Sequence, residues 1–264
     1  MRILKLEREL FEAKLDGDIE LVAMGDLHIG SKYCNLKEIE RYVKFVKERE
    51  NRYVCLMGDE LHALIPSRSA RYGFDQIYSL DEQLDIFYHL FEPLKGRILT
   101  KVSSTHTGWH KKLSLHDIDR EIARHLEAKY LGVGGYWLLT CGRKSYRMFQ
   151  QHGSGGSQQC HYQLEKAMFN YPNADVYLIG HIHKLYSKIY TKKIVIGNKV
   201  YEKNIWGIRT GCFVGQAEWA SEKFYPIASL GAPIIKFSSK KFDVSVILGL
   251  DEYGALNGND LPKN

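Results

Sequence analysis

The chain has 264 residues, of which 44% are hydrophobic and 26% are charged, and its formal net charge is +6. This composition supports a substantial core and excludes an intrinsically disordered chain, while the mild positive charge permits an anionic substrate without demanding nucleic acid. No stretch approaches the ~18 apolar residues of a membrane-spanning helix, and Met1–Arg8 does not have the apolar run of a signal peptide. The five cysteines are widely spaced and odd in number, which favours reduced thiols and a cytoplasmic location.

The first sixty residues predict a βαβ unit. The short apolar run Leu21–Met24 indicates a buried strand, residues 35–48 have the spacing of an amphipathic helix, and Tyr53–Met57 indicates a second strand. Residues 1–20 are expected to hold one further strand. In a βαβ unit the two strands are parallel, so their carboxyl ends lie at one edge of the sheet.

Potential metal ligands follow both of these strands. Asp26 and His28 are two residues apart, which places them on the same side of an extended segment. Asp59 follows the second strand, and open α/β sheets bind their ligands at such an edge. Taken alone, the Asp-x-His pair is a weak signal for metal, and a turn aspartate that caps a helix beside a surface histidine is the more common explanation.

The rest of the chain alternates strands and helices. The predicted helices cover residues 80–91, 115–130 and 158–169. The predicted strands cover residues 97–102, 136–140, 145–151 and 175–179, a hairpin at 185–201 that turns at Gly197-Asn198, and strands within 205–214 and 234–246. Residues 60–79 and 103–110 are expected to be loops, the first of them either a plain connector or a source of substrate contacts.

We predict a single domain over residues 1–264. Its motif core covers about residues 20–190, the C-terminal strands cover about 191–250, and residues 251–264 form a frayed tail.

Five predicted strand ends carry oxygen or imidazole groups. These residues are Asp26, His28, Asp59, Thr105, His106, His152, His181 and His183. Mixed imidazole and carboxylate ligands suit Zn²⁺, Mn²⁺ or Fe better than Ca²⁺. These candidate ligands are too many for one catalytic metal with an open position. They fit two metals ~3.5–4 Å apart that share a carboxylate. Because cysteine is absent from the set, a structural zinc site is disfavoured.

The order Asp-x-His, Gly-Asp, x-x-His, His-Gly and Gly-His-x-His over residues 20–190 resembles the calcineurin-like metallophosphoesterase superfamily. Residues 146–183 are especially similar to phosphoesterases encoded by phages and prophages, which would place the protein in a host cytoplasm. The resemblance implies an α/β (α+β) fold, a β-sandwich flanked by helices with the metal site at the strand carboxyl ends. It also implies two divalent ions, with Mn²⁺ preferred and Zn²⁺, Fe or Ni²⁺ as alternatives.

Carried over by position, the resemblance also assigns roles to residues. The first metal would be held by Asp26, His28, Asp59 and His183. The second would be held by Asp59, which bridges the two ions, and by His152 and His181. His106 matches the family histidine that contacts the phosphate and protonates the leaving oxygen, and a metal-bound hydroxide would be the nucleophile.

The third motif departs from the family pattern. The family has Gly-Asn before the histidine, and here these positions are Ser104-Thr105. A threonine hydroxyl is shorter than an amide side chain and a poorer ligand, so the second metal is expected to be weaker, differently coordinated or recruited by substrate. Alternatively, His106 or His110 takes the ligand role.

The expected substrate is a phosphodiester, with DNA or RNA as candidates. In the predicted hairpin, lysines such as Lys188 alternate with tyrosines, and lysines neutralise phosphates while tyrosines stack on bases. A solvated hairpin face is the alternative. Other candidates for substrate contact are Arg68, Arg71, His110 and the pair Lys111-Lys112.

Two other functions remain open from the sequence. A catalytically weakened member of the fold would act as a nucleic-acid-binding or scaffold protein, and a structural metal protein would bind metal without hydrolysis. The sequence predicts no oligomeric state.

Overall fold

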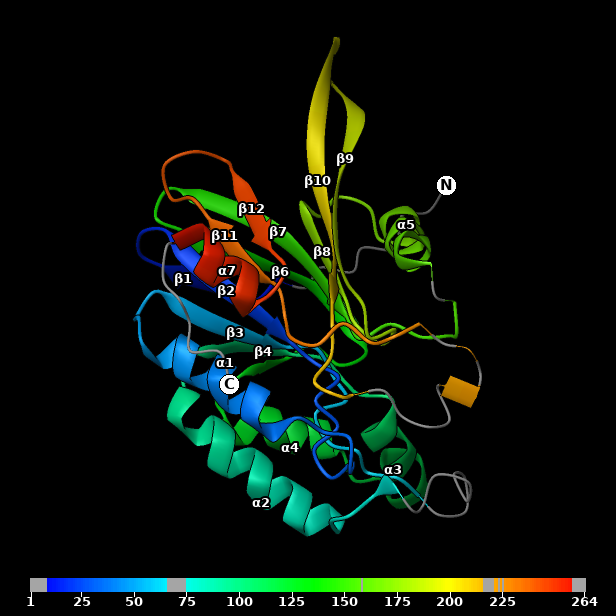
Figure 1. The fold of residues 1–264 in the computed structure, drawn as a ribbon. Coiled ribbons are helices and arrows are strands. Elements are labelled where there is room, and N and C mark those ends of the chain that lie inside the picture. The colour runs from blue at the N-terminus through cyan, green and yellow to red at the C-terminus, as the bar shows by residue number, and fades with distance from the viewer. Residues whose placement is uncertain are drawn as a thin grey trace.

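Two six-stranded mixed sheets form a sandwich with helices on both outer faces (Figure 1). The computed structural model describes residues 9–65, 75–157, 159–215, 221–222, 224 and 226–257. This confirms the predicted α/β fold of a sandwich flanked by helices. No helix in these ranges is long and apolar enough to cross a lipid bilayer.

One sheet supplies the strands that precede Asp26, Asp59 and Thr105. Its strand order is β12 (Val244–Ile247), β11 (Ile234–Phe237), β2 (Ile19–Met24), β3 (Arg52–Leu56), β4 (Ile98–Lys101) and β5 (Lys129–Tyr130). Strands β2, β3, β4 and β5 are parallel, as the predicted βαβ unit requires. Their carboxyl ends therefore lie at one edge.

The other sheet supplies the strands that precede His152 and His181. Its order is β1 (Glu12–Leu15), β6 (Gly134–Cys141), β7 (Lys144–Gln151), β8 (Val176–Ile179), β10 (Lys199–Thr210) and β9 (Leu185–Ile196). Strands β7 and β8 are parallel, and β9 and β10 form a long antiparallel ribbon that projects beyond the sandwich (yellow in Figure 1).

The helices cover the two outer faces. Helices α1 (Leu36–Lys47), α2 (Leu80–Phe91), α4 (Ile118–His125) and α7 (Leu250–Asn257) share one buried cluster with the sheet of β2, and the short 3-10 helix Glu92–Leu94 extends α2. Helix α5 (Cys160–Asn170) packs on the opposite sheet, and α3 (His106–Ser114) lies near the strand ends. Asn35 caps α1, and Ser79 with Glu82 forms a capping box on α2, which explains why both helices begin where predicted.

The inner faces of the two sheets form a second buried cluster. It joins residues of β2 such as Leu21 to residues of β6 and β8 such as Trp137 and Leu178, all inaccessible to solvent. Burial of this apolar surface fixes the relative position of the two sheets, and therefore of their strand ends.

Three predictions about the elements were wrong. Residues 103–110 are not all loop, because α3 begins at His106, and the helix expected over 115–130 is the shorter α4, since Leu115 ends α3 in a left-handed conformation and β5 begins at Lys129. The break expected between the hairpin that ends at residue 201 and the strand that begins at 205 does not exist, because β10 pairs with β9 along its whole length and its residues Trp206–Arg209 also pair with β8.

A fourth correction concerns the tail. Residues 250–257 form α7, in which Tyr253 is buried and its hydroxyl donates to Glu20 Oε1 at 2.8 Å. Residues 258–264 lie outside the described ranges. The prediction of a single domain stays a prediction.

Candidate metal centre

The loops that follow the strands hold several residues in a left-handed backbone conformation. The φ angles lie between 48° and 78° at Asp26, His28, Asp59, His181 and His183. Such conformations cost of order 1–3 kcal/mol for residues other than glycine and are concentrated at functional sites. The expectation that Asp26 and His28 share a side because the segment is extended was therefore wrong, since β2 ends at Met24 and both residues lie in the turn beyond it.

A first group of ligand atoms consists of Asp26, His28 and His183. Asp26 Oδ1 lies 3.3 Å from His183 Nε2 and 3.9 Å from His28 Nε2, and the two Nε2 atoms are 3.3 Å apart. Asp26 and His28 are buried, and His183 is partly exposed. One face of the group is therefore open to solvent.

A second group consists of Asp59, His152 and His181. His152 Nε2 lies 3.0 Å from Asp59 Oδ2 and 3.1 Å from His181 Nδ1. His152 Nε2 also lies 4.0 Å from Asp26 Oδ1, so the two groups adjoin. The structure thus brings together the six imidazole and carboxylate residues that the resemblance assigns to metals, although their roles as ligands stay predictions.

The spacing within both groups fits metal coordination. Ligands that bind one ion at ~2.0–2.2 Å lie roughly 3–3.6 Å from one another, and most of the distances above fall in that range. In addition, Asp26 Oδ1 is buried without a hydrogen-bond partner, which is costly for a carboxylate oxygen. A cation between these atoms would satisfy it.

Backbone carbonyls fix the orientation of two histidines. The carbonyl of Met57 can only accept, so His152 Nδ1 donates to it at 2.9 Å, and Nε2 is the ring nitrogen that faces the second group. His106 Nδ1 donates to the carbonyl of His62 in the same way. The nitrogen of His106 that remains to exchange a proton is Nε2.

The groups are strongly coupled electrostatically. Burial alone would raise the pKa of Asp26, but the charges of His152 and His183 lower it to about 2. Burial would lower the pKa of His152, but Asp59 and Asp26 raise it to about 9. Burial, followed by the charge of His106, holds the pKa of His28 well below its usual value. The two carboxylates are thus ionised and raise the pKa of the neighbouring His152 and His183, and a cation bound here would replace the protons on these imidazoles.

Asp59 has two oxygens in different environments. Its Oδ1 accepts hydrogen bonds from the backbone N–H groups of Thr105 at 2.7 Å and His106 at 3.0 Å. Its Oδ2 faces His152. The start of α3 therefore orients Asp59, while Oδ2 is the oxygen available to the second group.

A buried charge network that the sequence analysis missed supports this loop. Lys101 Nζ lies 2.6 Å from Glu60 Oε2 and 2.9 Å from Asp119 Oδ1, and none of the three is more than 2% exposed. The Ser104 hydroxyl contacts both carboxylates and accepts from the N–H of Asp59 at 2.7 Å. The signal was present in the sequence, since Lys101 closes an apolar strand where an unpaired charge would be costly.

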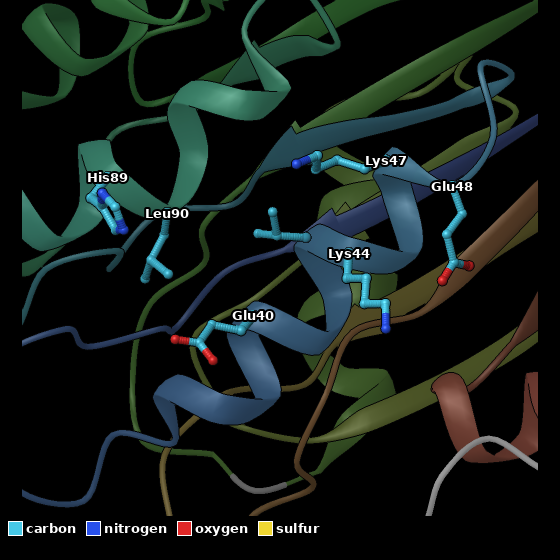
Figure 2. Close-up of a pocket in the computed structure, with 7 residues that line it drawn as sticks. Glu40, Lys44, Lys47, Glu48, His89 and Leu90 are labelled. Atoms are coloured by element: carbon cyan, nitrogen blue, oxygen red, sulfur yellow. The ribbon is translucent and has the colours of Figure 1, made fainter.

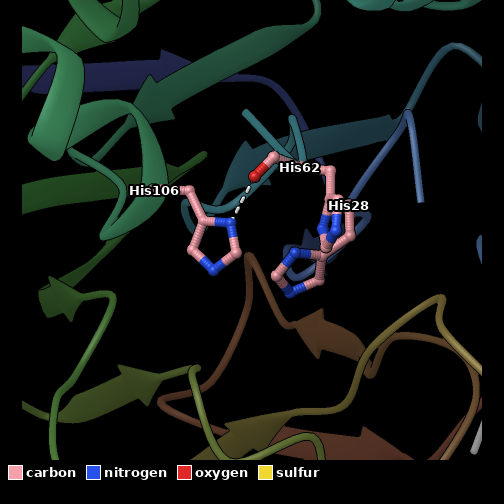
Figure 3. A group of neighbouring side chains, drawn as sticks. All are labelled: His28, His62 and His106. Carbon is pink, nitrogen blue, oxygen red and sulfur yellow. Dashed lines mark hydrogen bonds between the residues drawn. The ribbon is translucent and has the colours of Figure 1, made fainter. Parts of the chain in front are cut away.

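His62 is a second residue that the sequence analysis missed. Figure 3 shows the rings of His62 and His28 next to each other, with His106 to their left, and the ring nitrogens of the three residues form a third group of ligand atoms. Both nitrogens of His62 are buried without a hydrogen-bond partner, and burial, followed by the charge of His106, lowers its pKa to about 4. His62 is therefore a neutral imidazole in contact with the centre.

Two further candidates, His110 and Thr105, are not members of the three groups. The ring of His106 stacks on Trp109, whereas His110 Nε2 donates to the carbonyl of Ala63 at 3.0 Å and belongs to none of the groups formed by the described residues. The backbone N–H of Thr105 donates to Asp59 Oδ1, and a ligand role of the Thr105 hydroxyl stays a prediction.

The predicted substrate contacts are only partly described. Arg68 and Arg71 lie outside the described ranges. Lys188 is exposed on β9, near the end of the ribbon that is closer to the centre, since Leu185 begins that strand two residues after His183. Its contact with substrate stays a prediction.

Gly58 is required by close packing against His152. Its φ is 93°, and a Cβ atom there would lie 2.9 Å from His152 Nδ1 and 3.0 Å from the carbonyl oxygen of Ser103. Any larger residue would displace the histidine. The Gly-Asp motif therefore positions two members of the second group.

Two cavities differ in their relation to the centre. A groove of about 620 Å³ is lined by Thr105, Trp109 and His152, so it borders the second group. Another cavity, of about 460 Å³, lies between α1 and α2, where Figure 2 shows Glu40, Lys44 and His89 around it. None of its lining residues belongs to the three groups.

Comparisons with known proteins were made at the level of sequence and structure. No family model and no curated protein matches the chain. Similar solved structures include Vacuolar Protein Sorting 29 from Cryptosporidium parvum, with 14% identity over 88% of this chain and 97% of that one and a TM-score of 0.39. They also include the NAD nucleotidase of Haemophilus influenzae, with 10% identity over 87% and 49% and a TM-score of 0.44, and nuclease MPE of Pseudomonas putida, with 11% identity over 86% and 87% and a TM-score of 0.38.

These proteins carry the names of a sorting protein, a nucleotidase and a nuclease, so they do not share one stated function. The narrower resemblance to phage and prophage enzymes receives no support from the comparisons. The two stacked mixed sheets flanked by helices, with the motifs of residues 20–190 gathered at the strand ends, are the arrangement that the sequence resemblance implies.

Proposed function

We propose that this protein is a dinuclear metal-dependent phosphoesterase that hydrolyses phosphodiesters. The observation that carries the proposal is the pair of adjoining ligand groups, with Asp26 Oδ1 within 4.0 Å of Nε2 atoms from both. The first ion would be held by Asp26, His28 and His183, and the second by His152 and His181. Asp59 would be shared by the two ions, and its Oδ2 is the oxygen that faces the second group.

The ions would supply Lewis acidity toward the phosphoryl oxygens and lower the pKa of a bound water. Mn²⁺ is our first choice because the site mixes imidazole with carboxylate, and Zn²⁺, Fe and Ni²⁺ are alternatives. The protein would contribute ligands held rigidly by buried strands and by the Lys101 network, so that little reorganisation accompanies the reaction.

His106 would deliver a proton to the leaving oxygen. Its Nδ1–H is held by the carbonyl of His62 and its ring by Trp109, which leaves Nε2 to carry the transferred proton. His62 would remain neutral beside it and limit the positive charge of the cluster. His106 therefore acts from a fixed orientation.

The experiment is hydrolysis of a chromogenic phosphodiester by chelator-treated protein to which Mn²⁺ is added back. We expect metal-dependent hydrolysis by wild type and none by Asp59→Asn, because loss of the bridging carboxylate weakens both ions. Asp85→Asn, an exposed position on α2, is the control and should retain full activity. Metal binding without hydrolysis of either mono- or diesters would instead favour the scaffold alternative.

A further inference from the structure

The groove that borders the second group extends the candidate centre in one direction. Thr105 and His152 form its inner end, and its volume of about 620 Å³ exceeds the space that a phosphate group alone would fill. A ligand whose phosphate contacted the metal centre would therefore place its next chemical group in this groove.

The outer wall of the groove is apolar and exposed. Leu115 is 90% exposed and Val133 is 73% exposed, and both line the groove together with Trp109. Leu115 occupies the left-handed position at the C-terminus of α3, with φ of 60°, where helix termination favours glycine or asparagine. Helix termination therefore does not explain a leucine here, whereas an exposed apolar wall beside a polar centre is typical of a binding surface.

The charges of the groove favour an anionic ligand. Lys111 and Lys112 line it, and Lys111 is paired with Asp117 Oδ2 at 2.6 Å, so Lys112 is the lysine more available to a ligand. Asp119 also lines the groove, but it is buried against Lys101, which it shares with Glu60. Lysines beside an aromatic ring are the combination that binds nucleotides, since the ring stacks on a base and the lysines attract phosphate.

Trp109 links the groove to the proposed proton donor. Its ring lies 5.0 Å from that of His106 with an interplanar angle of 17°. A base held against this wall would belong to the nucleoside directly attached to the reacting phosphate. Trp109 lies too close to the proposed proton donor to contact a base several nucleotides away from the reacting phosphate.

We infer that the groove formed by Trp109, Leu115, Val133 and Lys112 binds the nucleoside next to the scissile phosphate. The protein therefore prefers nucleotide-bearing phosphodiesters to diesters with small alkyl groups. This inference rests on the proposed function and names its class of substrate.

The test compares two substrates with the same leaving group. Thymidine 5′-(p-nitrophenyl phosphate) and methyl p-nitrophenyl phosphate differ only in the group opposite p-nitrophenol. The ratio of their kcat/KM values therefore reports the nucleoside contact. A change in His106 alters proton transfer to the same leaving group in both substrates, so its effect cancels in this ratio. We expect wild type to favour the thymidine ester by about 5- to 150-fold, the range that one stacked base contributes.

Three variants locate the contact. Trp109→Ala should bring the ratio close to one, and Leu115→Asn should lower it several-fold while keeping a residue that tolerates the left-handed backbone. Leu113→Asn is the matched control, because Leu113 is an exposed leucine of the same helix that does not line the groove. It should keep the wild-type ratio.

A wild-type ratio near one, or a ratio that neither Trp109→Ala nor Leu115→Asn lowers, would overturn the inference. If wild type hydrolyses neither substrate, the proposed function fails, and the groove is then judged by equilibrium binding of the dinucleotide thymidylyl-thymidine. Weaker binding by Leu115→Asn than by wild type and Leu113→Asn would support the groove. Equal binding by all three would refute it.

Discussion

The chemistry of single residues separates the metal ligands from the groups that move protons. Asp26, Asp59 and His152 are held by backbone groups or by one another, whereas His106 retains a free Nε2. This division predicts different consequences of substitution in the two classes.

Substitution of His106 tests the proton-donor role. His106→Ala should slow substrates with poor leaving groups by ~10²–10⁴, and substrates with good leaving groups much less, because the latter need no proton. The measurement is kcat for a series of aryl and alkyl diesters, with His116→Ala as an exposed control. Metal content should not change, and loss of an ion in His106→Ala would instead make His106 a ligand.

Substitution of Thr105 tests the unusual third motif. An asparagine reaches further than a threonine and offers a carbonyl oxygen, so Thr105→Asn should tighten the second metal site by ~10–100-fold, as small changes around metals do. The backbone N–H that binds Asp59 is retained in this variant. The measurement is activity as a function of added Mn²⁺, and Thr105→Ser, which keeps the hydroxyl, should behave as wild type.

The prediction for Thr105 has a clear contrary outcome. Two equally tight ions in wild type, one of them loosened by Thr105→Asn, would mean that another residue already completes the second site. His110 was the first suspect from the sequence, but its Nε2 is engaged by the carbonyl of Ala63.

At the residue scale, the sequence predicted the six members of the first and second groups because each follows a short apolar run beside glycine or another ligand. It did not predict Glu60, His62 and Asp119. Their importance depends on which strands and loops pack together, and periodicity within one segment carries no information about that.

At the scale of elements, local signals located most helices. Asn35 and Ser79 carry side chains that cap α1 and α2, so both helices begin at the predicted position. Helix α3 was missed because His106–Ser114 has little apolar periodicity and no side-chain cap at Thr105. Its place is determined instead by the bonds from its first N–H groups to Asp59.

The ribbon of β9 and β10 gives the element-scale prediction. Its register places Lys188, Lys192 and Lys199 on one face together with Tyr190 and Tyr201. The ribbon runs from the metal centre outward, so a long nucleic acid can contact these lysines but a small diester cannot.

The triple variant Lys188→Gln, Lys192→Gln and Lys199→Gln should therefore weaken binding of a long oligonucleotide. It should reduce the slope of log K against log salt by about 2–3, because each phosphate contact contributes roughly 0.7–0.9. Hydrolysis of a small chromogenic diester should be unaffected. Lys193 lies on the opposite face of the ribbon, so Lys193→Gln serves as the control. Equal salt slopes for all proteins would mean that the lysines do not contact nucleic acid and instead keep the edge strand β9 from pairing with another chain.

At the scale of the whole molecule, stability depends on charges that connect strands. Asp175 precedes β8 and is buried, and it accepts hydrogen bonds from Arg147 of β7 and Lys203 of β10. Burial alone would raise its pKa, but these two partners lower it. The ionised carboxylate thus stabilises the folded state.

The contribution of Asp175 should depend on pH. Because the folded pKa lies below the unfolded value of ~4, the stabilisation is present above pH ~4 and is lost as the pH falls through the folded pKa. Asp175→Asn should lower the free energy of unfolding at pH 7 by about 1–3 kcal/mol. Urea unfolding at pH 7 and below pH 4 measures this, and an equal difference at both pH values would contradict the assignment.

The whole-molecule arrangement was predictable only in outline. The order of strands and helices together with the motif resemblance indicated a sandwich with its site at one edge. The sequence did not reveal that β10 continues from the ribbon into the sheet beside β8, because both segments are compatible with separate strands until their pairing is known.

The central claim is that two ions occupy two adjoining groups of ligands. Equilibrium dialysis of chelator-treated protein against Mn²⁺ at concentrations that also saturate the weaker second site, followed by metal analysis, tests this most directly. We expect two ions per chain in wild type, loss of the first in His28→Ala and loss of the second in His181→Ala, since each histidine belongs to one group only of the two. A single ion per chain in wild type, or loss of the same ion in both variants, would contradict the dinuclear centre.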